Sequence, residues 1–167
     1  GPQFASGAFT HPQGEVRAQA VRLCIEAAEL AANRGIDHVI LWMGPDGFDY
    51  PLQSDFRQLW QYELDGFRSV CDATPTVRIS IEYKPAEPRR QAVVRNMGEA
   101  LLMVSDVDRR NFGVTLDYCH LLMSRESPAA AASLAMQRGK LFGVHLNDGY
   151  GSLDDGMMVG SVTLWQT

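Results

Sequence analysis

The sequence predicts an α/β protein in which about four parallel strands alternate with helices. Short, continuous apolar runs such as 38–43 and 112–117 are typical of strands that are covered on both faces. Between these runs lie longer segments in which apolar residues recur at helical spacing. Strands and helices that alternate through short connections favour parallel pairing by right-handed crossovers.

The first half of the chain contains two of these units. A helix is expected over 15–33, where the apolar positions fall on one face. The apolar run 38–43 is the first expected strand, and a turn-rich loop follows it. Ser54 or Asp55 can then cap a second helix that reaches about Cys71.

The second half repeats the pattern. The expected elements are strands over 77–82, 112–117 and 141–146 and helices over 89–104 and 128–138. Pro128 stands in the first turn of the last helix, where its missing N–H is not needed. The apolar tail, 157–167, is expected to begin a further helix.

Composition limits the class of protein. With 167 residues, of which 46% are hydrophobic, the chain is long enough for one domain with its own core. A net charge of −5 without a basic block argues against nucleic acid and anionic membranes as partners. No apolar run is long enough to span a bilayer. The three cysteines are widely separated and odd in number, which predicts reduced thiols in a cytoplasmic protein.

The first two residues, Gly1-Pro2, resemble the scar that a tag-cleaving protease leaves. Residues 3–167 are therefore taken as a single domain, and no signal peptide is expected.

Residues with metal-binding chemistry stand where three of the expected strands end. Glu82 ends one strand, Asp117 ends the next with His120 three residues later, and His145 lies near the end of the last. The carboxyl ends of parallel strands in a barrel open at one mouth, where active sites lie. Singly, each residue has an ordinary explanation, such as a cap on the following turn for Asp117. Together they form a mixed oxygen and nitrogen ligand set for Mn²⁺, Mg²⁺, Co²⁺ or Zn²⁺.

Two architectures fit the alternation of strands and helices, a doubly wound sheet and a (β/α)₈ barrel. A glycine-rich phosphate loop after a strand would favour the doubly wound sheet. No strand of this sequence leads into G-x-G-x-x-G or a P-loop.

Several motifs resemble those of xylose isomerase-like sugar isomerases, and the resemblance covers nearly the whole chain. Glu82-Tyr83-Lys84-Pro85 is similar to the Glu-Pro-Lys-Pro motif of xylose isomerases, and Asp117-x-x-His120 resembles their carboxylate-x-x-His element. The segment His145-Leu146-Asn147-Asp148 resembles the His-x-Asn-Asp strand of L-rhamnose isomerases. Thr10-His11-Pro12 and Trp42 also match the rhamnose isomerase pattern.

The resemblance implies a partial (β/α)₈ TIM barrel that runs from the third helix to the region after the seventh strand. It implies a metal-dependent isomerase that interconverts aldose and ketose sugars by a hydride shift, with Mn²⁺ as the first expectation. Glu82, Asp117 and His145 would hold one metal ion. The second would be held by Asp117, His120, Asp154 and Asp155.

One stretch departs from the family pattern. The family separates its last two acidic ligands by one residue, whereas Asp154 and Asp155 are adjacent. The choice between ligand and loop turn therefore stays open for Asp154.

The resemblance also implies which residues meet the sugar. Lys84 would contact a substrate oxygen, and Trp42 would line the sugar pocket. Lys84, His120 and Asp154 are the candidate catalytic residues, and a small sugar is the expected substrate.

Two other functions remain open. A sugar 3-epimerase of the same superfamily uses one metal and two opposing Glu residues, of which the second would lie outside this chain; Lys84 favours the isomerase. The chain could instead be a non-catalytic barrel fragment. Two unpaired strand edges and an apolar inner sheet face predict a homo-oligomer, most simply a dimer. A more distant relative of this superfamily is an endonuclease that cuts DNA at abasic sites. Such an enzyme needs a basic face and more His ligands than the four histidines of this sequence supply, which argues against that function.

Overall fold

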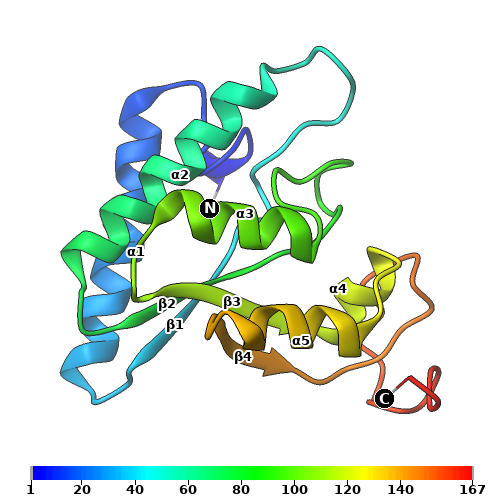
Figure 1. Cartoon of the computed structure of the whole chain (residues 1–167). Coiled ribbons are helices and arrows are strands. Elements are labelled where there is room, and N and C mark those ends of the chain that lie inside the picture. Colours follow the sequence, from blue (N-terminus) through cyan, green and yellow to red (C-terminus); the bar gives the residue numbers. More distant parts are fainter. Residues whose placement is uncertain (1, 167) are drawn as a thin grey trace.

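Four parallel strands form one sheet in the computed structural model, which describes residues 2–166 (Figure 1). The strands follow one another in the sheet in chain order: β1 (His38–Trp42), β2 (Arg78–Glu82), β3 (Phe112–Asp117) and β4 (Leu141–His145). This sheet confirms the prediction of parallel strands that alternate with helices. It is the arrangement expected of part of a TIM barrel.

The helices connect these strands and lie along the sheet (Figure 1). They are α1 (Gly14–Asn33), α2 (Phe56–Ala73), α3 (Met97–Val107), α4 (Tyr118–Met123) and α5 (Pro128–Gln137), after a short 3₁₀ turn, η1 (Pro2–Phe4). Asp55 is the cap of α2, because its side chain accepts a hydrogen bond from the backbone N–H of Arg57. None of the described helices is long and apolar enough to cross a membrane.

The face of the sheet that meets the helices is apolar and buried. The residues on this face alternate along the strands and include Leu41, Ile79, Ile81, Val114 and Leu116. They pack with the helix residues of one continuous core, among them Phe67, Val70, Met103 and Val107. Burial of each such large side chain stabilises the fold by roughly 1.5–3 kcal/mol.

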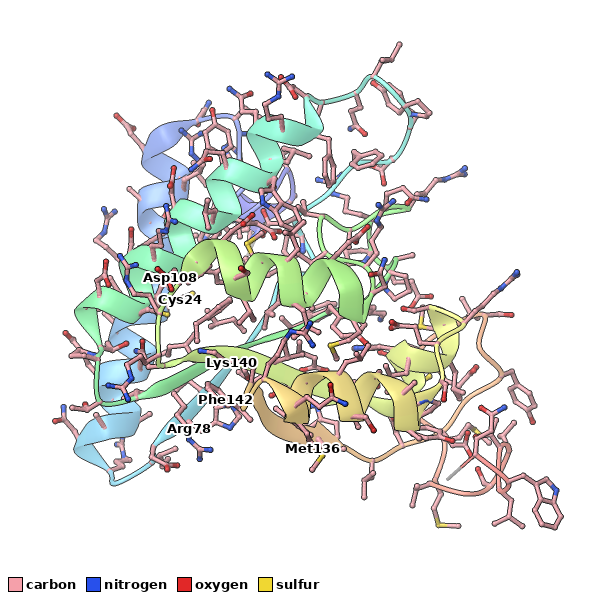
Figure 2. All side chains as sticks on the ribbon, viewed as in Figure 1. Cys24, Arg78, Asp108, Met136, Lys140 and Phe142 are labelled. Carbon is pink, nitrogen blue, oxygen red and sulfur yellow. The ribbon has the colours of Figure 1, made fainter. Side chains whose placement is uncertain are left out.

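The opposite face of the sheet, which would be the inside of a barrel, is polar at its centre. Ser80 forms hydrogen bonds across the strands to the His38 imidazole, at 2.8 Å, and to the Thr115 hydroxyl, at 2.7 Å. Phe142 and Arg78 pack beside this row, with the guanidinium 5.7 Å from the ring centre (Figure 2). The expectation of an apolar inner face was therefore wrong, because the aliphatic strand residues face the helices instead.

The third helix begins later than the sequence pattern predicts, at Met97 and not at Arg89. The segment before it is held by tertiary contacts, since the Arg89 guanidinium binds Asp49 at 2.8 Å and also donates to two backbone carbonyls. Asn96 then caps the helix by accepting a hydrogen bond from the Glu99 N–H.

The C-terminal tail does not form the expected helix in its described part, up to Gln166. It turns back on the loop after β4 through an antiparallel bridge between Asp148 and Met157. The buried Asp148 carboxylate then accepts hydrogen bonds from the N–H groups of Val162 and Thr163. These side-chain bonds hold the tail as irregular chain, against its apolar pattern.

The cysteines Cys24, Cys71 and Cys119 are all free, as the sequence predicted. Burial, together with a smaller effect of the Asp72 charge, raises the pKa of the Cys71 thiol to about 12. Such a thiol is inert and serves as a small apolar side chain.

We propose that the chain self-associates through the two outer strands of the sheet. Within residues 2–166, β1 and β4 each pair with one neighbour only, so each has a row of unpaired backbone groups. Apolar side chains on and beside β4 are exposed, including Val144, Leu146 and Met136, and Met136 is 65% exposed. Figure 2 labels Met136 on the helix beside this strand. In a twofold dimer β1 of one copy would lie beside β4 of the other, so both edges would be covered together.

At micromolar concentration we therefore expect a dimer in sedimentation experiments. Val144→Lys should shift the population to monomer, because a charge at the β4 edge opposes pairing. Leu30→Lys, at a similarly exposed position on α1, is the matched control and should leave the dimer intact. A wild-type monomer with a cooperative melt would show that the edges need no partner.

Candidate metal centre

Each strand ends in a residue that the sequence singled out. Trp42, Glu82, Asp117 and His145 are the last residues of β1, β2, β3 and β4. Trp42 pairs with Glu82 and Asp117 pairs with His145 in the parallel register. Because paired residues of parallel strands point to the same face, all four side chains emerge at one edge on the inner face.

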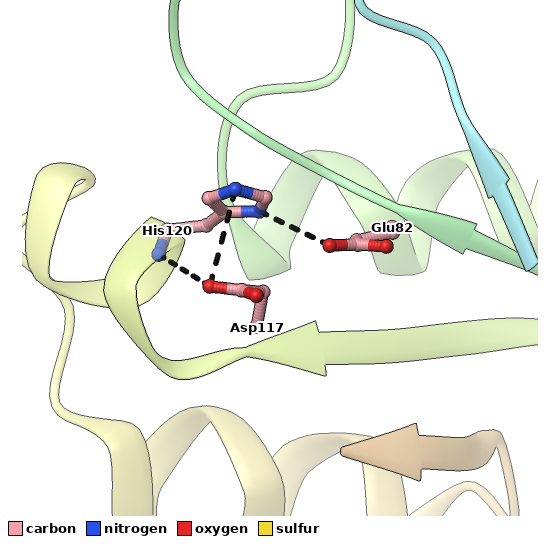
Figure 3. A group of neighbouring side chains, drawn as sticks. All are labelled: Glu82, Asp117 and His120. Atoms are coloured by element: carbon pink, nitrogen blue, oxygen red, sulfur yellow. Dashed lines mark hydrogen bonds and ion pairs between the residues drawn. The ribbon is translucent and has the colours of Figure 1, made fainter. Parts of the chain in front are cut away.

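Two carboxylates and an imidazole form the centre of the site (Figure 3). Ligand atoms of Glu82, Asp117 and His120 all lie within 4.8 Å of one another. The His145 ring joins them from β4, with Nδ1 3.3 Å from a Glu82 oxygen and 3.8 Å from an Asp117 oxygen. All four residues predicted from the strand ends therefore come together.

His120 comes from α4, the short helix that follows β3. Its Nδ1 is 3.0 Å from the Tyr83 carbonyl oxygen, which can only accept a hydrogen bond, so Nδ1 carries the proton. The Nε2 atom then faces oxygens of Asp154, at 3.3 Å, and Asp117, at 3.9 Å. The Nε2 lone pair and the two carboxylates are all electron-rich. A second ring proton on Nε2 or a metal ion between Nε2 and the carboxylate oxygens would remove this repulsion.

Asn147 holds the Asp117 carboxylate in place, and sequence reasoning did not assign it this role. Its amide nitrogen donates to both Asp117 oxygens, at 3.0 and 2.9 Å, and its oxygen accepts from the Cys119 N–H. Asp117 also accepts from the His120 N–H, so it caps α4 as well. The His-x-Asn spacing, in which Asn147 follows His145 by two residues, is the sequence signal that could have identified this role.

Lys84 is buried beside the centre and pairs with two carboxylates, those of Asp154 and Glu87, each at 3.0 Å. Burial lowers the pKa of Lys84, but the hydrogen bonds to Asp154 and Glu87 outweigh this and raise it. Burial likewise opposes ionisation of Asp154, yet Lys84 and His120 lower its pKa. Lys84 therefore stays a cation at neutral pH. Glu87 was not predicted, although it lies only three residues after Lys84 in the sequence.

Asp154 and Asp155 differ in position. Asp154 reaches His120 and Lys84, whereas the Asp155 carboxylate accepts a hydrogen bond from the Tyr150 N–H at 2.8 Å. The structure thus brings Asp154 into the cluster and places Asp155 in the turn of the same loop.

An open pocket of about 370 Å³ lies over these groups. Trp42 forms part of its wall, and its ring centre is 5.6 Å from the Lys84 ammonium. The other lining residues are Glu82, Lys84, Asp117, His120, Asn147 and Asp154. The pocket therefore combines an apolar wall with polar groups that converge on one point, as in many small-molecule sites.

The donor set fits a divalent cation. Glu82 and Asp117 are largely buried, with side chains 12% and 8% exposed, yet in the described part of the chain neither forms an ion pair with Lys or Arg. Two close carboxylates without a cation repel each other, so a bound ion would stabilise both. Carboxylate and imidazole ligands are those that Mn²⁺, Co²⁺ and Zn²⁺ accept.

Comparison with known proteins identifies the class. A family model described as a xylose isomerase-like TIM barrel matches residues 3–164, so the chain belongs to this family. Xylose isomerase from Thermus thermophilus is 30% identical over 152 residues. That alignment covers 88% of this chain and 39% of the relative, so the chain spans about two fifths of the enzyme it matches.

Solved structures share the fold. A D-tagatose 3-epimerase-like protein superimposes with a TM-score of 0.79 at 20% identity, over 94% of this chain and 58% of the other. D-allulose 3-epimerase from Methylomonas sp. gives a TM-score of 0.74 at 18% identity, over 90% and 54%. These likenesses support the partial barrel seen in the sheet.

The loop that carries Asp154 depends on Asp148, which closes it. Burial opposes ionisation of Asp148, but hydrogen bonds from Thr163, Val162 and Gly149 hold its pKa well below the usual range.

We expect Asp148→Ala to release the tail and to speed amide hydrogen exchange at Val162 and Thr163 by at least about tenfold. Asp37→Ala, at an exposed ion pair with Arg78, is the control. Unchanged exchange in Asp148→Ala would mean that other contacts hold the tail.

Proposed function

We propose that this chain carries the metal site of a metal-dependent sugar isomerase that interconverts an aldose and a ketose. The observation that carries the proposal is the convergence of Glu82, Asp117 and His145 from three successive strands of a xylose isomerase-like chain. In this proposal these three residues hold the first metal ion. Mn²⁺ is our first choice, with Mg²⁺, Co²⁺ and Zn²⁺ as alternatives.

A second metal would be held by Asp117, His120 and Asp154. The Nε2 atom of His120 and the oxygens of the two carboxylates already face one another. Asp155 could join this set only if the loop gave up its hydrogen bond to the Tyr150 N–H. Asp154 is therefore the better candidate of the adjacent pair.

A bound divalent ion would supply the Lewis acid that polarises the carbonyl and hydroxyl oxygens of a sugar. The residues of the chain would orient the substrate around that chemistry. Lys84 is a buried cation and would exchange its hydrogen bond to Asp154 for one to a substrate oxygen that gains negative charge. Trp42 would contact the apolar face of the sugar, since its ring is half exposed on the pocket wall.

The rest of a barrel would complete the site, because the chain spans about two fifths of the enzyme that it matches. Sugar binding and turnover are thus proposed for the whole protein, and metal binding is proposed for this chain. The free cysteines suit a reducing compartment, and we propose a cytoplasmic location.

Metal binding can be measured directly on this chain by titration calorimetry with MnCl₂. Glu82→Gln and Asp117→Asn should each weaken Mn²⁺ binding by more than tenfold, because even the loss of a group that only supports a ligand costs 10–100-fold. Glu26→Gln, on the exposed side of α1, is the matched control and should bind as wild type.

The adjacent aspartates provide a further comparison in the same experiment. Asp154→Asn should weaken the second binding step and Asp155→Asn should not. Wild-type Mn²⁺ affinity in Glu82→Gln would refute the first metal site.

The reaction class can be tested with the whole protein and candidate sugars in D₂O. A hydride shift keeps the transferred hydrogen out of solvent, so the product should contain no deuterium at the reacting carbon. Deuterium at that carbon would instead indicate proton transfer, as in the alternative 3-epimerase function.

A further inference from the structure

Glu63 is a buried acid that the proposed function does not use. It lies on α2, points towards the carboxyl ends of β1 and β2, and is fully inaccessible to solvent. Both of its carboxyl oxygens lack a hydrogen-bond partner, and among the described residues they are the only buried side-chain polar atoms in this situation. A buried polar group without a partner is costly, so something not yet described must bind it.

A small chamber lies against Glu63, underneath the candidate metal centre. Its walls include Glu82 and Lys84 of the site, Glu87, and residues of the loop after β1 such as Gly44. The space that the centre of a water molecule can occupy is about 10 Å³. This is the volume of roughly one ordered water, and it leaves no room for a larger ligand.

The charges around Glu63 favour its neutral form. Burial raises the pKa of Glu63 well above its usual value, and the nearby Asp46 carboxylate raises it further. Asp46 is itself buried and is held by hydrogen bonds from the Thr10 and Ala8 N–H groups. The charged groups on the chamber wall are Glu82 and Glu87, which add negative charge, and Lys84, which is paired with carboxylates.

Lys84 supplies the second partner that such a water needs. An ammonium group can donate three hydrogen bonds, and the carboxylates of Asp154 and Glu87 accept two of them. A third donor of Lys84 therefore remains for a water in the chamber that this residue lines.

We infer that the chamber between Glu63 and Lys84 is a binding site for a single water molecule, which the carboxylic acid of Glu63 holds. The water accepts hydrogen bonds from the Glu63 O–H and from Lys84, and so links a neutral acid below the site to the cation inside it. A cation in the chamber is disfavoured because Lys84, itself a cation, is among the residues that line it. An empty chamber would leave both Glu63 oxygens without a partner.

High-resolution crystal structures of wild type and Glu63→Leu test the water site. We expect one ordered water within hydrogen-bond distance of Glu63 and Lys84 in wild type, and none there in Glu63→Leu. An empty wild-type chamber would overturn the inference, as would a water that stays in the same position without Glu63. The wild-type structure decides this even if the variant does not fold.

The neutral form of Glu63 is tested by the pH dependence of unfolding in Glu63→Gln. Because the native pKa is raised well above its usual value, wild type keeps a proton above pH 5 that its unfolded chain loses, so its stability falls as pH rises. The folded-to-unfolded ratio of Glu63→Gln relative to wild type should therefore rise at least tenfold from pH 5 to pH 8. Glu26→Gln should show no such trend, and a flat ratio for Glu63→Gln would refute the neutral acid.

Discussion

The parallel register of the four strands is the constraint on which the rest of the structure depends. It aligns Trp42 with Glu82 and Asp117 with His145, so groups distant in sequence meet at one edge. A shift of one residue in any strand would turn its last side chain towards the helices. The buried aliphatic residues prevent such a shift, because it would also move them out of the core. Core packing therefore sets the positions of the site residues.

The site concentrates charge that water would normally solvate. Four carboxylates, those of Glu82, Glu87, Asp117 and Asp154, lie in or beside the site, and only two of them, Glu87 and Asp154, pair with the Lys84 ammonium. The one positive charge of Lys84 is shared by Glu87 and Asp154, and the other two carboxylates lie beside the imidazoles of His120 and His145. An arrangement of this kind is costly without a counter-ion, and a site built for a divalent cation accounts for it.

Support for the centre comes from groups around it that are not themselves candidate ligands. Asn147 fixes the orientation of Asp117, and the carbonyl of Tyr83 fixes which nitrogen of His120 is free. Asp148 closes the loop that brings Asp154 over the cluster. Such supporting hydrogen bonds usually decide how well a metal site is organised. The unpartnered Glu63 lies below them, on the side of the sheet that the helices cover.

Local pattern determined the strands, most of the helices and the candidate metal ligands at the strand ends. The reason is physical: apolar periodicity reflects which face is buried, and parallel strands carry their last residues to a common edge. Predictions from local pattern were wrong where hydrogen bonds between residues distant in sequence fix the backbone. The Arg89–Asp49 pair keeps its segment out of α3, and Asp148 holds the tail as irregular chain.

Only the tertiary structure showed that the adjacent acids Asp154 and Asp155 differ in position, because both have the same local sequence context and differ in where the loop turns. It also showed that the inner sheet face is polar, since alternation along a strand does not say which face the helices cover. The complete burial of Glu63 could not be predicted from the sequence either, because a Glu in the middle of a helix is normally exposed to solvent.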